Sequence, residues 1–473
     1  MNENTVGYTS LYEKIKIEKV EELIKIFSYK HDLMILNSAL TMPGYGQYSY
    51  ICFDAFSSFL AKNKTFIWNN QPIDIDDPFD FINTQIDHYK IQKNDLLPPF
   101  QGGAVGYFGY EASHYLEALP YVPDNIKLPD IYLCFYNQVI AIDHASQEAW
   151  IICHEFPEKN QEAELINAQA KIQKIKEMIN QNINIKNTCL NNLAKNLINK
   201  PVSNFSQKSY EKAVSQTRDY ILCGDIFEAN ISQQFKAKIH EKVDPLALYL
   251  QLIQLNPAPF SAFIKIPDDG YIISASPERF VRLIDQTVET SPIKGTIKRS
   301  KNLNEDAALA KKLEKSEKDW AENIMIVDLM RNDFSKICMP SSVVVEELCV
   351  LKSFATVHHL VSKITGKLKP GLNAIDVLKA TFPAGSITGA PKIRAMEIIS
   401  ELEMQARGPY CGCIGYLSFT GDMDTSVIIR TYFIKHDQIY FSAGGAVVLD
   451  SIPEEEYVES LVKAQALMDV LTL

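Results

Sequence analysis

Short polar turns join neighbouring apolar stretches of this chain, and this pairing limits its fold more than any other feature. Residues 260–266 and 271–275 are two predicted strands separated by an aspartate-rich turn. Residues 131–136 and 148–153 form a second predicted pair, linked by a polar stretch that includes Asp143. Because a tight turn can join only antiparallel neighbours, we predict antiparallel hairpins.

Helical periodicity occurs in separate stretches after residue 205. Apolar residues recur on one face from residue 210 to 221, and Gly224 follows as a stop signal. Longer helices are predicted for residues 305–331, 391–405 and 453–470, the last two with a proline suited to a first helical turn. Hairpins and helices that are grouped rather than alternating favour an α+β fold over a parallel doubly wound sheet.

A change in composition divides the chain. Residues 155–205 contain first a helical stretch rich in Glu, Gln, Lys and Ala and then an asparagine-rich polar stretch. We therefore predict an N-terminal region (residues 1–155), a helical and asparagine-rich connection (156–204) and a C-terminal region (205–473).

Composition excludes several classes of protein. The chain has 473 residues, of which 46% are hydrophobic, and a formal net charge of −11. Because phosphate binding requires a basic surface, we expect no nucleic-acid role. No apolar segment approaches the roughly twenty residues of a membrane helix, and residues 1–6 do not resemble a signal peptide. Nine cysteines without a disulfide framework indicate free thiols, so we expect a cytoplasmic protein without membrane association.

Lys294 stands in the segment Ser291-Pro292-Ile293-Lys294-Gly295-Thr296. The proline restricts the backbone before the lysine, and the glycine leaves the backbone after it open to a ligand. A lysine so placed is a candidate nucleophile if it spends time in the neutral form. We expect a partly desolvated pocket to lower its pKa from the solution value of about 10.4.

Glu278 follows Pro277 at the end of an apolar strand, with Arg279 and Arg282 near enough in sequence to influence its charge. A carboxyl group with a raised pKa could serve there as a general acid. The ordinary alternative is a solvated or salt-bridged carboxylate at a strand end.

Further carboxylates occur in two predicted helices. Glu322 lies among apolar residues, so it needs a partner: either Lys318 or Arg331 in an ion pair, or a magnesium ion, which takes hard oxygen ligands. Glu456 and Glu459 are three residues apart and share one helical face. Acidic residues in a first helical turn are also ordinary partners of the helix dipole.

Groups that could bind an anionic ligand occur near the end of the chain. Arg430 interrupts an apolar strand, and a guanidinium can grip a carboxylate with two hydrogen bonds. Gly444 and Gly445 would let backbone N–H groups approach an anion. A structural ion pair and a tight turn are the ordinary alternatives.

These segments together resemble the chorismate-utilising enzymes, and most closely the aminodeoxychorismate synthase component I branch. Ser276-Pro277-Glu278-Arg279-Phe280, the segment around Lys294 and residues 321–329 carry the resemblance, which is strong over residues 205–468. The form Pro-Ile-Lys-Gly-Thr is typical of that branch, whereas anthranilate synthases have alanine at the position of Lys294.

The resemblance implies a fold and a reaction. The fold would be two antiparallel sheets in a β-sandwich-like core flanked by helices, with residues 205–473 as the chorismate-binding catalytic region. The reaction would be a transferase step that converts chorismate and ammonia to 4-amino-4-deoxychorismate in 4-aminobenzoate and folate biosynthesis. Because Gly412-Cys413-Ile414-Gly415 lacks the spacing of a nucleophile elbow, a separate glutamine amidotransferase subunit would supply the ammonia.

The resemblance also assigns roles by position. Lys294 would be the nucleophile and Glu278 the general acid. Glu322 and Glu459 would bind Mg²⁺ directly, and Glu456 would bind it through water. The remaining positions would contact the substrate: Thr296, His359, Ser386, Tyr410, Arg430, Gly444, Gly445 and Lys463.

Two features of the resemblance leave questions open. Asn37, Ser38, Pro257 and Phe260 match a pocket that binds tryptophan in relatives, as inhibitor or as structural ligand, although asparagine and serine can also simply close a turn. Glu228 departs from the family pattern, which has glutamine in ammonia-using members and lysine in isochorismate synthases. Glu228 therefore argues against isochorismate formation, and its own role stays open.

Two other functions compete with the main hypothesis. The first is anthranilate synthase component I, which shares the fold and differs at the position of Lys294. The second is a non-catalytic subunit that binds tryptophan or docks an amidotransferase, which the full set of acidic and cationic positions disfavours.

Overall fold

The computed structural model describes residues 10–17, 19–41, 44–154, 161–182, 199–240, 243–353 and 357–472. Residues 1–6, and most of the asparagine-rich connection, lie outside the described residues. Within them, no helix is both long and apolar enough to cross a membrane.

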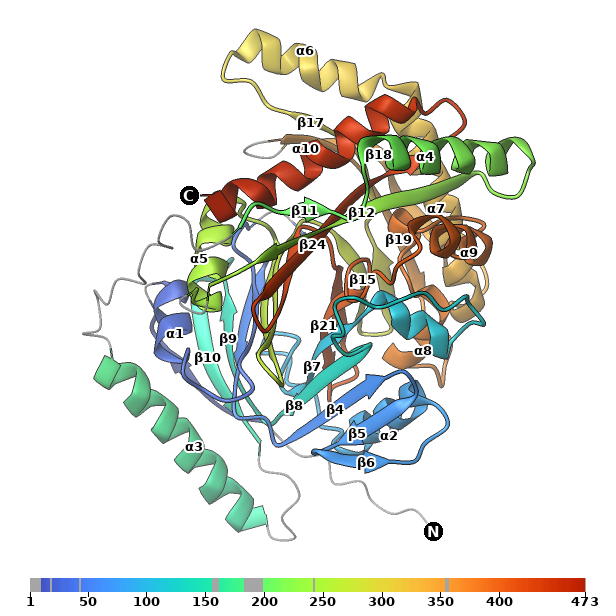
Figure 1. The fold of residues 1–473 in the computed structure, drawn as a ribbon. Helices are drawn as coiled ribbons and strands as arrows, with labels where there is room; N and C mark the ends of the chain where they lie inside the picture. Colours follow the sequence, from blue (N-terminus) through green and yellow to red (C-terminus); the bar gives the residue numbers. More distant parts are fainter. Residues whose placement is uncertain are drawn as a thin grey trace.

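Two large antiparallel sheets form the centre of the molecule (Figure 1). In spatial order, the first sheet consists of β1 (Leu11–Ile15), β10 (Glu148–Cys153), β9 (Gln138–Asp143), β3 (Tyr48–Cys52), β2 (Met34–Asn37), β13 (Phe260–Ile266), β14 (Gly270–Ser276), β23 (Thr431–Lys435), β24 (Gln438–Val447), β12 (Glu228–Lys238) and β11 (Val202–Ser203), with β20 (Gly389–Ala390) beside β12. The second consists of β17 (Ile293–Lys298), β19 (Val357–Lys367), β16 (Thr287–Thr290), β15 (Arg279–Ile284), β22 (Met423–Val427), β21 (Cys413–Ser418), β7 (Gly103–Phe108), β8 (Ile131–Tyr136), β4 (Ser57–Lys62), β5 (Thr65–Trp68) and β6 (Gln71–Ile73), with β18 (Val344–Ser353) beside β19.

Helices cover the sheets (Figure 1). They are α1 (Val20–Ile26), α2 (Pro78–His88), α3 (Gln161–Asn182), α4 (Gln207–Leu222), α5 (Pro245–Leu255), α6 (Leu303–Glu314), α7 (Glu317–Ile337), α8 (Ala374–Thr381), α9 (Lys392–Glu403) and α10 (Pro453–Thr472), with two 3₁₀ turns, η1 (Tyr110–Tyr115) and η2 (Gly385–Ile387).

Alternating side chains of the first sheet enter two different hydrophobic cores. Tyr50 and Ile152 pack toward the second sheet, in one cluster with Phe59 of β4. Their neighbours Ile51 and Ile151 point the other way, into a cluster with side chains of α1, α3, α5 and α10. Because successive side chains of a strand point to opposite faces, this sheet is buried on both sides. The predicted α+β fold with a sandwich-like core is confirmed.

Strands from both ends of the chain share each sheet. Ile35 of β2 pairs with Phe263 of β13, and Gly106 of β7 pairs with Gly415 of β21. The predicted N-terminal and C-terminal regions therefore do not pack as separate sheets. Their boundaries, and that of the connection containing α3, stay a prediction.

Local signals predicted some elements correctly. The hairpin of β13 and β14 has positive φ at Asp268 (58) and Asp269 (55), a conformation that aspartate tolerates in tight turns. The helix predicted at 210–221 is α4, whose N-terminus is capped by the side chain of Ser206. Pro453 begins α10, as predicted.

Two predicted elements were wrong. The strand at 131–136 does not pair with 148–153: it is β8 in the second sheet, and the partner of β10 is β9, because the chain crosses between sheets at Asn137. The single helix predicted for 305–331 is two helices. Ser316 caps the second by accepting a hydrogen bond from the Asp319 N–H, which ends the first helix at Glu314.

Candidate active site

Lys294 projects from β17 at a break in strand pairing. The register of β17 with β19 shifts between Lys294 and Thr296, and Gly295 between them has a φ of +80. A side chain at Gly295 would also meet the side chain of Asp319 at 3.0 Å. Glycine is therefore required there, and the bulge it forms sets the direction of Lys294.

The ammonium group of Lys294 is paired with carboxylates. Its Nζ lies 3.0 Å from Glu228 Oε1 and 3.9 Å from Glu322 Oε2. Glu228 begins β12 and is 0% exposed, and among the described residues its Oε2 has no hydrogen-bond partner. The side chain of Lys294 is only 10% exposed.

The pKa of Lys294 moves opposite to our expectation. Burial lowers it, but the carboxylates of Glu228, Glu322 and Glu278 outweigh burial and raise it above 10.5. Burial alone would have lowered the pKa of Lys294, as expected. The expectation failed because the sequence does not reveal that Glu228 lies beside this lysine.

Glu278 lies buried in the link between β14 and β15. The Ser386 hydroxyl donates a hydrogen bond of 2.7 Å to its Oε1. Burial raises the pKa of Glu278 to about 7, although Ser386 and the charges of Lys294, Arg430 and Lys463 oppose the rise. A carboxyl group that holds its proton near neutral pH suits a general acid.

The cations that influence Glu278 are not those nearest in sequence. Arg279 instead makes a bidentate pair with Asp424, at 3.0 and 3.1 Å, and a further bond with Glu289. Arg282 also pairs with Glu289. The prediction that Arg279 and Arg282 act on Glu278 was wrong because both guanidinium groups pair with other carboxylates.

Arg430 lies at a bend between β22 and β23, with a φ of 51, where it interrupts the run of strand residues. It influences the pKa of both Glu278 and His359. Among the described residues, no hydrogen bond or ion pair engages its guanidinium. An unengaged guanidinium beside these two groups is suited to receive a carboxylate.

His359 and Thr296 face each other across β19 and β17. They are register partners, and Thr296 Oγ1 lies 2.7 Å from His359 Nδ1. Burial, with the charge of Arg430, lowers the pKa of His359 to about 4. The imidazole is therefore neutral at physiological pH and can exchange hydrogen bonds without carrying charge.

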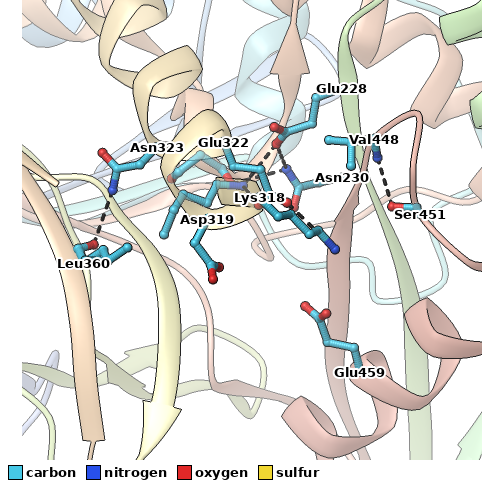
Figure 2. A network of polar contacts seen from close by, with 12 residues as sticks. Glu228, Asn230, Lys318, Asp319, Glu322, Asn323, Leu360, Val448, Ser451 and Glu459 are labelled. Atoms are coloured by element: carbon cyan, nitrogen blue, oxygen red, sulfur yellow. Dashed lines mark hydrogen bonds and ion pairs between the residues drawn. The ribbon is translucent and has the colours of Figure 1, made fainter. Parts of the chain in front are cut away.

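Three further carboxylates converge from α7 and α10. Glu322 comes from α7, and Glu456 and Glu459 come from the first turns of α10. Lys318 Nζ lies 3.9 Å from Glu322 Oε1 and 3.5 Å from Glu456 Oε1. Figure 2 shows Lys318 and Glu322 on one side and Glu459 approaching from α10 on the other. Of the two ion-pair partners considered for Glu322, Lys318 is present, whereas Arg331 pairs with Asp328.

Burial raises the pKa of Glu322 to about 7, against the lowering effect of Lys294. Burial also raises the pKa of Glu456, whose Oε1 accepts a hydrogen bond of 2.7 Å from Ser451. At Glu459 burial raises the pKa too, but Lys463, Lys318 and Lys294 together outweigh it and the net shift is downward. The nearby lysines therefore stabilise the charged form of Glu459 but do not offset the burial of Glu322 and Glu456.

Gly444 and Gly445 lie within β24 and not in a tight turn. A Cβ at Gly445 would lie 3.0 Å from Glu456 Oε2 and 3.3 Å from Glu459 Oε1, and one at Gly444 would meet the Ile231 carbonyl at 2.2 Å. The Gly444 carbonyl accepts a hydrogen bond of 3.0 Å from Lys463, which also pairs with Glu459. Glycine here leaves room for the carboxylates.

The acidic groups can be tested for their fit to a cation. Among the described residues, no three acidic, histidine or cysteine side chains are arranged to hold a metal ion. Lys318 stands between Glu322 and Glu456. Glu456 Oε2 is nevertheless buried without a partner, and carboxylate oxygens are the ligands magnesium prefers. The carboxylate oxygens are thus the kind of ligand that Mg²⁺ takes, although the three side chains are not arranged around one point, and the predicted ion stays a prediction.

Tyr410 is buried, and its ring packs against the guanidinium of Arg407. The guanidinium of Arg407 is 5.9 Å from the ring of Tyr410 and 4.9 Å from that of Tyr110. Arg407 pairs with Glu403 through two nitrogens, at 3.0 and 2.7 Å, and donates to the carbonyls of Ile387 and Asn230. It thereby holds the segments that carry Ser386 and Glu228. No motif marks this arginine, so sequence reasoning missed it.

Arg407→Leu should destabilise the fold by about 3–5 kcal/mol, because it leaves the buried Glu403 without its counter-charge. Urea unfolding followed by circular dichroism measures this. Arg331→Leu is the matched control, since it breaks an exposed pair and should cost less than about 1 kcal/mol. Equal losses in the two variants would contradict the role given to Arg407.

A separate cavity of about 110 Å³ lies between the sheets. Asn37, Ser38 and Phe260, three of the four residues predicted for a tryptophan pocket, line it together with Arg279. Pro259 also lines this cavity and Pro257 does not, and the tryptophan pocket itself stays a prediction.

The chain is similar to known proteins over the segments that form this site. A family model described as chorismate binding enzyme matches residues 37–469. The chain belongs to this family. The matched range includes every residue assigned above to the site, so the site lies within the chorismate-binding part of the chain.

Two kinds of named relative are similar to this chain. Aminodeoxychorismate synthase component 1 of Escherichia coli strain K12 is 41% identical over 399 residues, which cover 84% of this chain and 83% of that protein. Anthranilate synthase component 1 of Acetivibrio thermocellus is 38% identical over 423 residues, covering 87% and 84%. The crystal structure of anthranilate synthase component I from Streptococcus pneumoniae TIGR4 has a TM-score of 0.78 at 34% identity, covering 91% of this chain and 93% of that one.

Proposed function

We propose that this chain is the chorismate-aminating component of an aminodeoxychorismate synthase, which replaces a ring hydroxyl of chorismate with an amino group from ammonia. One observation carries the proposal: a buried lysine, Lys294, lies beside Glu228 and within electrostatic reach of Glu278, the carboxyl group that retains its proton. A nucleophile and an acid are thereby available in one pocket. The relative from Escherichia coli supports the same assignment.

The proposed reaction has two substitutions. In the first, Lys294 Nζ forms a bond to the ring carbon beside the carboxylate-bearing carbon, the double bonds shift, and the ring hydroxyl leaves as water with a proton from Glu278. In the second, ammonia forms a bond where the hydroxyl was, the double bonds shift back, and the lysine amine is released. Dividing one difficult substitution in this way is covalent catalysis.

Glu228 has a place in this sequence. Lys294 is charged in the free site and must lose a proton before it attacks. Glu228 Oε1 is the acceptor at 3.0 Å, and its Oε2 has no hydrogen-bond partner within the described part of the chain. The carboxylate of Glu228 would hold that proton while the covalent bond exists.

The other residues would orient chorismate. Arg430 offers an unengaged guanidinium for a carboxylate, and Thr296, His359 and Tyr410 supply hydrogen-bonding groups on the surrounding elements. Glu322, Glu459 and, through water, Glu456 would hold Mg²⁺, whose positive charge would bind the ring carboxylate and withdraw electron density from the ring.

The proposal implies a partner. Proteins named component 1 act with a second component, and we propose a glutamine amidotransferase that supplies ammonia in 4-aminobenzoate and folate biosynthesis. Tryptophan is proposed as a ligand of the cavity lined by Asn37, Ser38 and Phe260.

Anthranilate synthase component I is the second candidate, because relatives of that name are nearly as similar. In that reaction ammonia attacks the ring directly, and pyruvate is eliminated. A lysine at position 294 disfavours it, since Nζ occupies space that ammonia would need.

Chromatography and mass spectrometry of the products distinguish the two candidates. With chorismate, Mg²⁺ and an ammonium salt, the purified chain should form 4-amino-4-deoxychorismate and no anthranilate. With glutamine instead of ammonium, it should form little product. Anthranilate as main product, or robust turnover with glutamine, would contradict the proposal.

A further inference from the structure

Lys318 contacts the acidic site but belongs to none of the motifs above. It lies one turn before Glu322 on α7, and its Nζ is 3.5 Å from Glu456 Oε1 and 3.9 Å from Glu322 Oε1. It therefore links the carboxylate of α7 to a carboxylate of α10. Figure 2 shows the side chain of Lys318 beside that of Glu322.

Lys294 and Lys318 both contact Glu322, and they differ in how tightly the surrounding structure holds them. Lys294 is 10% exposed and hydrogen-bonded to Glu228. The side chain of Lys318 is 52% exposed, and both its contacts are longer than 3.4 Å. A lysine has four flexible carbons between backbone and charge, so Lys318 can turn into solvent at little cost.

We propose that Lys318 is a tethered counter-ion of the acidic site, which neutralises Glu322 and Glu456 until a divalent cation displaces it. The inference rests on the proposed Mg²⁺ site and adds to it a residue that sets the affinity. A dication that coordinates the carboxylates directly delivers twice the charge of one ammonium group at a shorter distance, so the exchange favours the ion.

The exchange has a consequence in each state. Without the ion, Lys318 pairs with both Glu322 and Glu456, so it stabilises the folded chain. With the ion, breaking its two pairs subtracts from the free energy of binding. The same residue therefore weakens Mg²⁺ binding and protects the empty site.

Lys318→Met tests both consequences in the full chain, after removal of metal with EDTA and without substrate. Isothermal titration with magnesium chloride should give an affinity about three- to tenfold tighter than wild type, since partly exposed ion pairs are worth up to about 1 kcal/mol each. The melting temperature in EDTA should fall, and magnesium should raise it by more than in wild type.

Two matched variants control for the change. Arg331→Met removes a positive charge from the same helix, away from the carboxylates, and should leave the affinity at the wild-type value. Lys318→Arg keeps the charge and should also stay near wild type. Tighter binding in Lys318→Met alone supports the proposal, and so does binding detected only in that variant.

The opposite results overturn it distinctly. Equal affinities in wild type and Lys318→Met, or weaker binding in the variant, would overturn the role of Lys318 and leave the Mg²⁺ site standing. No heat of binding in either protein would overturn both the tethered counter-ion and the proposed ligand set.

Discussion

Lys294→Arg is expected to reduce formation of 4-amino-4-deoxychorismate by on the order of 10³-fold or more, because it removes the nucleophile and keeps the positive charge. Arginine can still pair with Glu228 and Glu322, so binding of chorismate should change far less than turnover. Steady-state kinetics with ammonium and chorismate measure the two effects separately. Near-normal turnover by the arginine variant would show that Lys294 serves only as a charge.

Lys294→Ala is expected to change the product as well as the rate. Removing the side chain opens space beside Glu228 in which ammonia can reach the ring carbon that Lys294 would have attacked. The residual product should therefore be an amino-isochorismate or anthranilate type, identified by mass and retention. If alanine lowers the rate and leaves the product unchanged, the lysine is not a nucleophile.

A matched control separates chemistry from packing in these variants. Lys392 has a side-chain exposure of 13%, close to that of Lys294, and pairs with the buried Asp333 at 2.7 Å. Lys392→Arg makes the same substitution in a similar setting outside the site. It should retain most activity, whereas a loss as large as that of Lys294→Arg would assign the effect to the size of arginine.

The sequence predicted the chemical groups of this site better than their electrostatics. Motifs located Lys294, Glu278 and Glu322, because each of these residues lies in a short segment that can be recognised from neighbouring residues alone. The charged state of Lys294 depends on Glu228, which is 66 residues away in the chain. Contacts between distant segments are fixed by sheet register and not by local pattern, so the rise in the pKa of Lys294 could not be foreseen.

The same limit explains the errors in the fold. The hairpin of β13 and β14 was predictable because its turn residues and alternation lie within one short segment. β8 and β9 are both apolar and almost continuous, and nothing local indicates that Asn137 passes the chain from one sheet to the other. Arg407 was missed for a related reason, since the carbonyl groups of Ile387 and Asn230 reach it only in the folded chain.

Glu278→Gln is expected to lower turnover by about 10²- to 10⁴-fold, the range for loss of a general acid. Glutamine can accept the Ser386 hydrogen bond and cannot donate a proton to the departing hydroxyl. In the wild type, the pKa of Glu278 is about 7, so kcat/KM should fall as pH rises above 7 and the acid form disappears. The variant should lose this pH dependence along with its activity.

The stability of the same variant gives an independent measurement. Burial raises the pKa of Glu278 from 4.5 to about 7, so the folded chain holds this proton more tightly than the unfolded chain, and the group's contribution to stability is lost as pH rises through 7. A shift of that size corresponds to roughly 3 kcal/mol. At pH 8 Glu278→Gln should therefore be more stable than wild type, by an amount that nearly vanishes at pH 4.

This gain distinguishes a general acid from a structural ion pair. If Glu278 served mainly as the partner of Arg430, its carboxylate would be favoured by folding, and glutamine would destabilise the chain most at pH 8. Urea unfolding of both proteins at pH 4, 6 and 8 decides the sign. If Glu278 is a buried acid without a matching charge, Glu278→Gln should be inactive, and its stability relative to wild type should increase as the pH rises.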